Sequence, residues 1–189
     1  MWEENNINFM KGSYTYSNSR TISPYSIHLK LEKGDEYKKA HLILNYNYHI
    51  NQEKRLQIRG YCGFVETTNP VYNIQMSAWN GTNDYMLEEN ALVRDLRNTH
   101  EIPYSQQLFI REGGLKHTTP DSLNSSQILA SINVEYNITS QFFRLYSEIG
   151  TDGKHIAYGS GIRIKALNNM LNIYLPLYTE NGIVETNKT

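Results

Sequence analysis

The sequence is poor in cysteine, in long apolar runs and in charge of one sign. Its single cysteine, Cys62, excludes an internal disulfide and a four-thiolate zinc site. No stretch approaches the roughly 18 apolar residues that a transmembrane helix needs. The formal net charge is −1, and the charged residues are scattered, so no field attracts nucleic acid or an anionic surface. We therefore expect no nucleic-acid partner.

The N-terminus lacks the basic and apolar regions of a secretory signal, because the segment from Met1 to Asn6 is acidic and polar. If the protein is exported, we expect its export signal to lie outside this sequence. The chain would then be a fragment or a mature segment of a longer protein.

Patterns typical of catalysis or metal binding are missing too. His41 and His49 share a strand face, but at about 3.3 Å per residue they lie roughly 27 Å apart, too far for one metal ion. His100-Glu101 resembles the start of a zinc-protease helix motif, but Pro103 opposes a helix there and the second histidine is absent. No spacing indicates a nucleophile with its base or paired carboxylates. We expect no catalytic, cofactor-binding or metal-binding residue, no cofactor, and a chain that is not an enzyme by itself.

What the sequence does contain is the alternation of apolar and polar residues. Apolar residues make up only 39% of the chain, and its 15 tyrosines suit surfaces where an apolar body meets water. From Tyr25 to Glu32 the odd positions are apolar or aromatic and the even positions polar, which is the period of a β-strand. The same period continues from His41 to Ile50 and from Ser126 to Asn137. Thr151-Asp152-Gly153 predicts a hairpin turn, since Asp-Gly is a favoured hairpin pair.

These patterns predict one all-β domain over residues 1–189, built as an antiparallel up-and-down meander of about ten strands. We expect the strands to begin near residues 12, 24, 36, 54, 71, 105, 126, 140, 154 and 169. Between about 79 and 125 the alternation fades into a long loop excursion, in which only Gln106 to Leu115 has the pattern of a strand and 86–98 could form a short helical turn. Residues 179–189 are expected to form a tail.

Strand length favours a membrane barrel. Most predicted strands have about ten residues, as a tilted strand crossing a bilayer requires roughly 9 to 11, whereas strands in soluble proteins average about 5 to 6. We therefore expect an outer-membrane-type β-barrel, possibly part of a larger one, with the lipid bilayer as its partner. The alternative is a soluble all-β barrel that binds a small apolar ligand. In that case the apolar face would point inward.

Charged residues recur on the polar faces of the predicted strands. A barrel places such residues against a wet or plugged lumen, where they form salt bridges or contact a permeating substrate. The residues are Arg55, Arg59, Arg111, Glu135, Arg144, Glu148, Arg163 and Lys165.

The order of five segments resembles a known kind of barrel. They are Pro24 to Glu32, Arg59 to Phe64, Asn83 to Tyr85, Tyr158 to Ile164 and Ile173 to Leu177. Together they resemble the C-terminal outer-membrane barrel of bacterial surface-antigen proteins, and especially the barrel attached to gluzincin aminopeptidase-like proteins of Gram-negative bacteria. The resemblance implies a membrane anchor, scaffold or pore in the bacterial outer membrane, with any catalytic domain upstream. The chain departs from many such barrels because it lacks an aromatic C-terminal residue.

Overall fold

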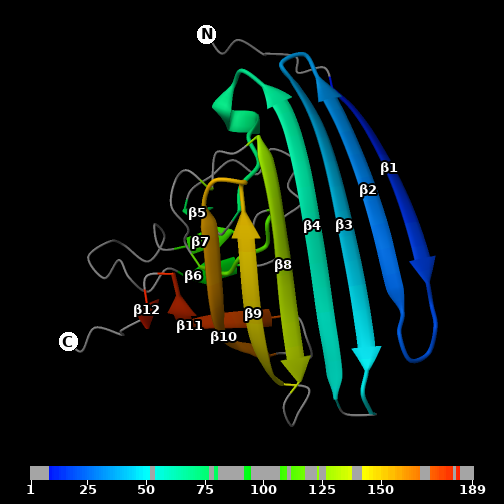
Figure 1. Cartoon of the computed structure of the whole chain (residues 1–189), viewed down its shortest axis with the longest axis vertical. Coiled ribbons are helices and arrows are strands. Elements are labelled where there is room, and N and C mark those ends of the chain that lie inside the picture. Colours follow the sequence, from blue (N-terminus) through cyan, green and yellow to red (C-terminus); the bar gives the residue numbers. More distant parts are fainter. Residues whose placement is uncertain are drawn as a thin grey trace.

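The structure, a computed structural model, describes residues 9–51, 54–76, 79–80, 92–94, 107–109, 112–117, 123, 127–137, 142–166, 171–180 and 182–183. Within them the chain forms two antiparallel sheets (Figure 1). No helix in this part of the chain is long and apolar enough to cross a membrane.

The main sheet is a meander in which sequence neighbours pair, in the order β1-β2-β3-β4-β8-β9-β10-β11-β12. Every neighbouring pair is antiparallel. Its members are β1 (Phe9–Asn18), β2 (Tyr25–Gly34), β3 (Tyr37–His49), β4 (Arg55–Thr67), β8 (Ile128–Asn137), β9 (Phe143–Thr151), β10 (Ile156–Ala166), β11 (Leu171–Thr179) and the two-residue β12 (Gly182–Ile183). The predicted all-β antiparallel meander is thus confirmed. Closure into a barrel stays a prediction, because within the described residues β1 and β12 each pair on one side only.

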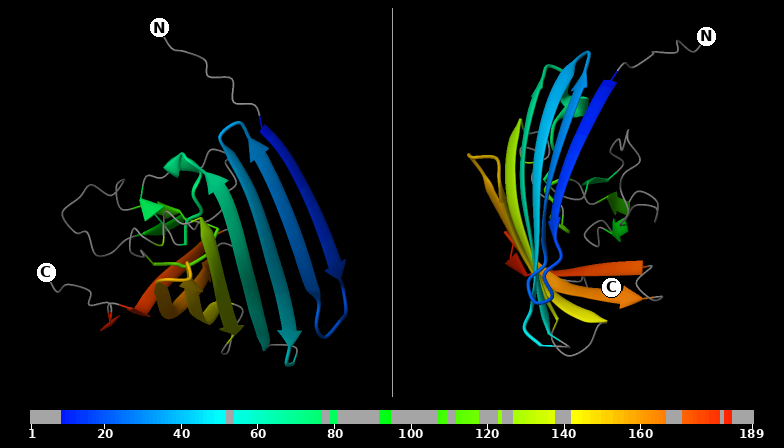
Figure 2. Two further views of the ribbon diagram at one scale, coloured as in Figure 1. Left: turned by 45° about the horizontal axis from the view of Figure 1, so that its top comes forward. Right: turned by 90° about the vertical axis from the view of Figure 1, so that its right-hand side faces the viewer.

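A long excursion leaves the sheet at the end of β4 and returns at the start of β8. It begins with the 3-10 turn η1 (Pro70–Tyr72) and contains the short strands β5 (Trp79–Asn80), β6 (Leu92–Arg94) and β7 (Gln107–Phe109), which pair as a separate small sheet. The main sheet is strongly curved, and these short strands lie on its concave side (Figure 2). The excursion therefore faces the interior of the curve.

Alternation gives the main sheet two unlike faces. Leu44, Gly60, Ile132 and Ile149 lie opposite one another along four neighbouring strands and point to the convex face. Large apolar side chains on this face are uncovered, with exposed fractions of 42% for Leu44 and 52% for Ile132. Other exposed members of this face are Leu29, Leu31, Leu42, Phe64, Ile128, Leu145, Tyr158 and Ile173. Cys62 lies among them in β4, the strand in which the sequence placed it.

The buried apolar residues lie on the opposite, concave side. Side chains from the sheet and from the excursion pack together there, and the cluster consists of Tyr37, Tyr61, Val65, Ile74, Met76, Leu115, Leu123, Leu129 and Ala157. Two glycines on the concave face make room for it, because a Cβ on Gly63 would lie 2.9 Å from Ile74 and one on Gly150 would lie 2.3 Å from Met76. The core is therefore a layer between sheet and excursion.

Four expectations from the sequence are wrong in detail. The strand predicted near residue 71 is the 3-10 turn η1, since Pro70 removes a backbone donor from a sheet. Within the predicted helical turn 86–98, residues Leu92–Arg94 form β6, and the rest lies outside the described residues. The tail predicted from 179 contributes Gly182–Ile183 to the sheet as β12. The strand predicted from Gln106 to Leu115 is only Gln107–Phe109.

Candidate functional site

The polar part of the concave face holds one piece of the excursion, Glu112–His117, which we call the inner segment. Residues Gly113 to His117 are all buried. Gly114 has a φ of +79°, a backbone conformation that side-chain-bearing residues rarely adopt, and a Cβ there would lie 2.7 Å from Arg59 Nη1. The two consecutive glycines thus let the backbone pass close to the wall of the sheet.

Side chains of β4 and β8 bind the backbone of the inner segment. Arg59 donates to the carbonyl oxygens of Glu112, at 2.7 Å, and Gly113, at 3.3 Å. Asn133 Nδ2 also donates to Gly113 O, at 3.2 Å, and the Ser131 hydroxyl donates to the same oxygen. A buried carbonyl on which three side chains converge is satisfied without a strand partner, so these contacts fix the inner segment at one place on the wall.

Lys116 and His117 reach a buried carboxylate on β9. Lys116 Nζ lies 3.2 Å from Glu148 Oε2 and 2.8 Å from Asn133 Oδ1, and the backbone N–H of Lys116 donates to Glu148 Oε1 at 2.6 Å. The side chain of Glu148 has no exposed surface. Because a buried charge needs a partner, removal of either cation would leave part of this cluster uncompensated.

His117 connects the cluster to the turn after β11. Its Nδ1 lies 3.0 Å from Glu148 Oε1 and its Nε2 lies 2.9 Å from Glu180 Oε2. The ring packs against β10 at Gly159, where a Cβ would come within 2.6 Å of Nδ1. One imidazole therefore joins the excursion, β9 and the end of the last long strand.

The charge of His117 follows from these contacts. Burial by itself lowers the pKa of the imidazole, but the hydrogen bonds to Glu148 and Glu180 outweigh burial and raise the pKa of His117 to about 9. For Glu180, burial raises the pKa, yet the hydrogen bond from His117 brings the pKa below its usual value. At neutral pH the ring is positively charged and donates from both nitrogens.

A second charged cluster lies farther along the same face. Glu135 on β8 accepts from Arg163 on β10 and from Arg144 on β9, the latter at 3.2 Å. Arg144 also donates to Gln57 on β4, and Arg163 donates to Asn172 on β11 at 2.9 Å through Nη2. This cluster ties five neighbouring strands together through their polar faces.

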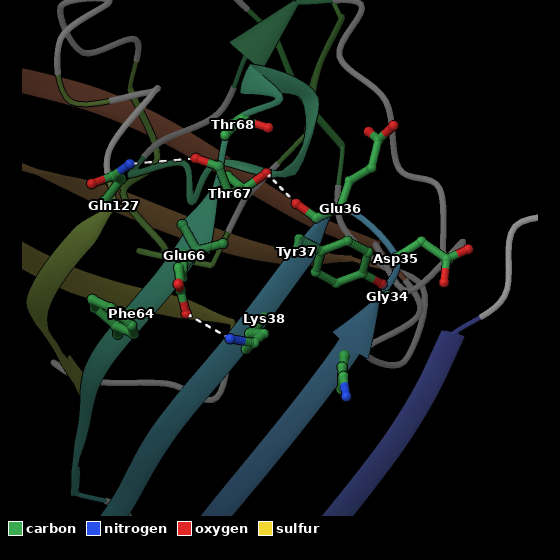
Figure 3. Close-up of a pocket in the computed structure, with 12 residues that line it drawn as sticks. Gly34, Asp35, Glu36, Tyr37, Lys38, Phe64, Glu66, Thr67, Thr68 and Gln127 are labelled. Carbon is green, nitrogen blue, oxygen red and sulfur yellow. Dashed lines mark hydrogen bonds and ion pairs between the residues drawn. The ribbon is translucent and has the colours of Figure 1, made fainter.

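A hollow of about 370 Å³ lies at the rim, where the β2–β3 turn meets the end of β4 (Figure 3). Lys38 Nζ and Glu66 Oε2 form an exposed ion pair of 3.1 Å beside it. The Thr67 hydroxyl donates to Glu36 O at 3.0 Å, and Gln127 donates to Thr67 O at 3.5 Å. These contacts join the rim of β2–β3 to both ends of the excursion.

The predicted polar-face residues differ in their surroundings. Arg59, Glu135, Arg144, Glu148 and Arg163 form the contacts described above, whereas Arg55 is exposed and Arg111 lies outside the described residues. Lys165 is half-buried on β10.

Sequence reasoning missed Lys116 and His117, since it assigned no role to a histidine inside the excursion. The signal that could have found them is the Gly113-Gly114 pair directly before Leu115-Lys116-His117.

The polar groups of the concave face bind a segment of the same chain. Among the described residues, no three His, Cys, Asp or Glu side chains form a group that could hold a metal ion. The carboxylates, cations and amides of the concave face form hydrogen bonds with one another and with the backbone of the inner segment. The concave face is therefore a polar wall to which part of the excursion is bound.

Comparison with models of protein families found no match, and comparison with curated proteins found none.

Proposed function

We propose that this chain forms part of the wall of a β-barrel in the outer membrane of a Gram-negative bacterium, where it serves as an anchor, a scaffold or a pore. The observation that carries the proposal is the convex face, on which large apolar side chains of eight strands stand uncovered. The charged residues of the long strands point to the concave side, apart from Lys33, Lys38 and Glu66 at one rim. Outer-membrane barrels have this apolar-out, polar-in alternation.

The energetics of the convex face support a lipid environment. Burial of one Leu, Ile or Phe side chain is worth about 1.5 to 3 kcal/mol. In water, half-exposed side chains such as Leu44, Phe64 and Ile132 forgo roughly half of that free energy, and a continuous apolar surface of this kind marks an interaction site. The long strands contain 9 to 13 residues, enough to cross a bilayer at a tilt.

The alternative, a soluble barrel with an apolar pocket, requires an apolar interior. The concave face instead carries Arg59, Asn133, Glu135 and Glu148, and its apolar cluster is filled by Met76, Leu115 and Leu123 of the excursion. The polarity of the two faces therefore favours the membrane barrel.

The resemblance to surface-antigen barrels supports a proposal about the larger protein to which this chain belongs. We propose that the chain is the C-terminal part of a larger surface or peptidase-like protein, with the lipid bilayer as its partner and any catalytic domain upstream.

Cys62 provides the test, because it lies on the convex face and is the only cysteine of the chain. The protein is purified from membranes in non-denaturing detergent, labelled at Cys62 with a fluorophore and reconstituted into vesicles whose acyl chains carry bromine. We expect bromine to quench the fluorescence and aqueous iodide to leave it unchanged.

The matched control carries the label on the concave face, as Asn45→Cys in a Cys62→Ala background. Asn45 lies opposite Arg59, so its label should respond to iodide and not to bromine. A soluble protein with Cys62 accessible to iodide would contradict the proposal and favour the alternative.

A further inference from the structure

We propose that the convex face binds one phospholipid with a phosphoethanolamine headgroup. The headgroup lies in the hollow at the rim, and one acyl chain lies in an apolar groove over β3, β4 and β8. The inference rests on the proposed function and adds the class of lipid that this part of the wall selects from the bilayer.

The groove is an apolar hollow of about 460 Å³ in the convex face. Small side chains form its floor, those of Gly60 and Cys62 on β4 and of Ala130 on β8. Larger apolar side chains stand around this floor, namely Leu42, Leu44, Ile132, Ile149 and Ile156. In a bilayer an acyl chain is surrounded by hydrocarbon everywhere, so close packing rather than exclusion of water selects this position.

The hollow at the rim, of about 370 Å³, supplies charges of both signs (Figure 3). Lys33 and Lys38 lie opposite each other on β2 and β3, and both are exposed. Glu66 of β4 and Asp35 of the β2–β3 turn line the same hollow. Ammonium groups bind a phosphate and carboxylates bind a primary amine, so the hollow matches both charges of phosphoethanolamine. In the complex, the exposed ion pair between Lys38 and Glu66 gives way to contacts of each side chain with the headgroup.

The hollow and the groove lie at the right separation for one lipid. Cys62 is four residues from Glu66 along β4 and Gly60 is six, which is roughly 13 Å and 20 Å at about 3.3 Å per residue. At a strand tilt of about 35–45°, these positions lie roughly 10 Å and 15 Å below the rim. One leaflet contributes about 15 Å, half of the hydrocarbon core of a bilayer. A lipid with its headgroup at the rim therefore reaches the groove within its own leaflet.

The test is photo-crosslinking with a lipid probe. The protein, without a label at Cys62, is reconstituted into phosphatidylcholine vesicles that contain a trace of phosphatidylethanolamine with a diazirine in the distal half of one acyl chain. Adducts are mapped by mass spectrometry and compared with those of the same probe carrying a choline headgroup. We expect the ethanolamine probe to give roughly fivefold more adducts in the groove, which corresponds to about 1 kcal/mol. Adducts at Tyr14 and Leu29, in the same cross-strand row as Cys62, should be equal for the two probes.

Two variants test the two parts of the site. Gly60→Leu fills the groove, and an added Cβ there has only Leu44 Cβ within 4 Å, at 3.9 Å. Its matched control is Gly12→Leu on the convex face of β1, where an added Cβ meets no atom within 4 Å. Lys33→Gln combined with Lys38→Gln removes the phosphate contacts, and Lys54→Gln in the turn at the opposite rim is the control. We expect both site variants to lose the enrichment and both controls to keep it.

Ala130→Leu fills the same groove from β8 and replaces Gly60→Leu if that variant does not insert. Equal adducts for both headgroups, or enrichment that survives either site variant, would overturn the inference and leave the membrane wall in place. A phosphatidylglycerol probe, which has the phosphate but no amine, should show no such enrichment; equal enrichment would overturn the choice of headgroup. The proposed function fails separately: no adducts with any probe, together with iodide quenching of the Cys62 label, would reject the wall itself.

Discussion

At the scale of single residues, His117 is the point where the excursion, β9 and the turn after β11 meet. Its pKa is raised to about 9, so its contribution to stability is complete below the unfolded value of about 6.5 and is lost as the pH rises through 9. Glu180, whose pKa is lowered, contributes its full share of stability at pH values above the usual pKa of about 4.5. That contribution is lost as the pH falls through the lowered pKa. The ion pair between His117 and Glu180 is therefore most stabilising from about pH 4.5 to 6.5.

We expect the protection of the inner segment against hydrogen exchange to decrease between pH 6.5 and pH 9.5. The rise of the His117 pKa from 6.5 to about 9 corresponds to roughly 3 kcal/mol. His117→Gln should show weaker protection at pH 6 and no further decrease up to pH 9.5, since glutamine does not titrate. Protection factors of the peptide Glu112–His117 measure this, and an unchanged wild-type profile over that range would contradict the assignment.

Gly114 offers a second prediction at this scale. Gly114→Ala places a Cβ in a left-handed conformation, at a cost of about 1 to 2 kcal/mol, and also displaces Arg59 from the inner segment. Gly153→Ala is the matched control, because Gly153 has a similar φ of +89° but no atom within 4 Å of its added Cβ. We expect hydrogen exchange of the inner segment to increase in the first variant and stay unchanged in the second.

At the scale of strands, each long strand separates an apolar convex face from a polar concave face, which the proposed function assigns to lipid and lumen. Leu44→Arg on the convex face of β3 should cost about 2 to 4 kcal/mol if this position lies at the bilayer midplane. Ser26→Arg on the concave face of the neighbouring β2 should cost little, because Ser26 lies opposite Asn45 on the polar side. The fraction of protein recovered in the membrane with native mobility measures both.

Loss of membrane insertion in Ser26→Arg, with none in Leu44→Arg, would reverse the assignment of the faces. Leu44→Phe separates the effect of charge from that of altered packing and should insert normally.

At the scale of the whole molecule, the proposed membrane wall requires detergent or lipid on the convex face of the main sheet. We expect the protein, purified in detergent, to show a different electrophoretic mobility before and after boiling, and to aggregate when detergent is removed. Electrophoresis of heated and unheated samples tests this directly. A soluble, β-rich monomer in plain buffer would contradict the proposed membrane wall.

Most of the sheet could be predicted because its signals are local. Alternation locates β2, β3, β8 and the C-terminal strands, and the hairpin expected at Asp152-Gly153 forms with Asp152 Oδ1 accepting from the backbone N–H of Lys154 and His155. These hydrogen bonds outweigh partial burial and lower the pKa of Asp152 to about 2. The excursion itself was predicted, but its contacts with the sheet could not be, because no periodic pattern connects Lys116 with Glu148 or Arg59 with Gly113.

The sequence by itself determined the strands, the turns and the separation of apolar from polar residues, since a period of two acts between neighbours along the chain. The tertiary structure alone decided which face is uncovered, where the inner segment binds and how the edge strands run. Those features depend on pairs such as Arg59 with Glu112 and His117 with Glu180, which lie more than 50 positions apart and meet only when the sheet curves around the excursion.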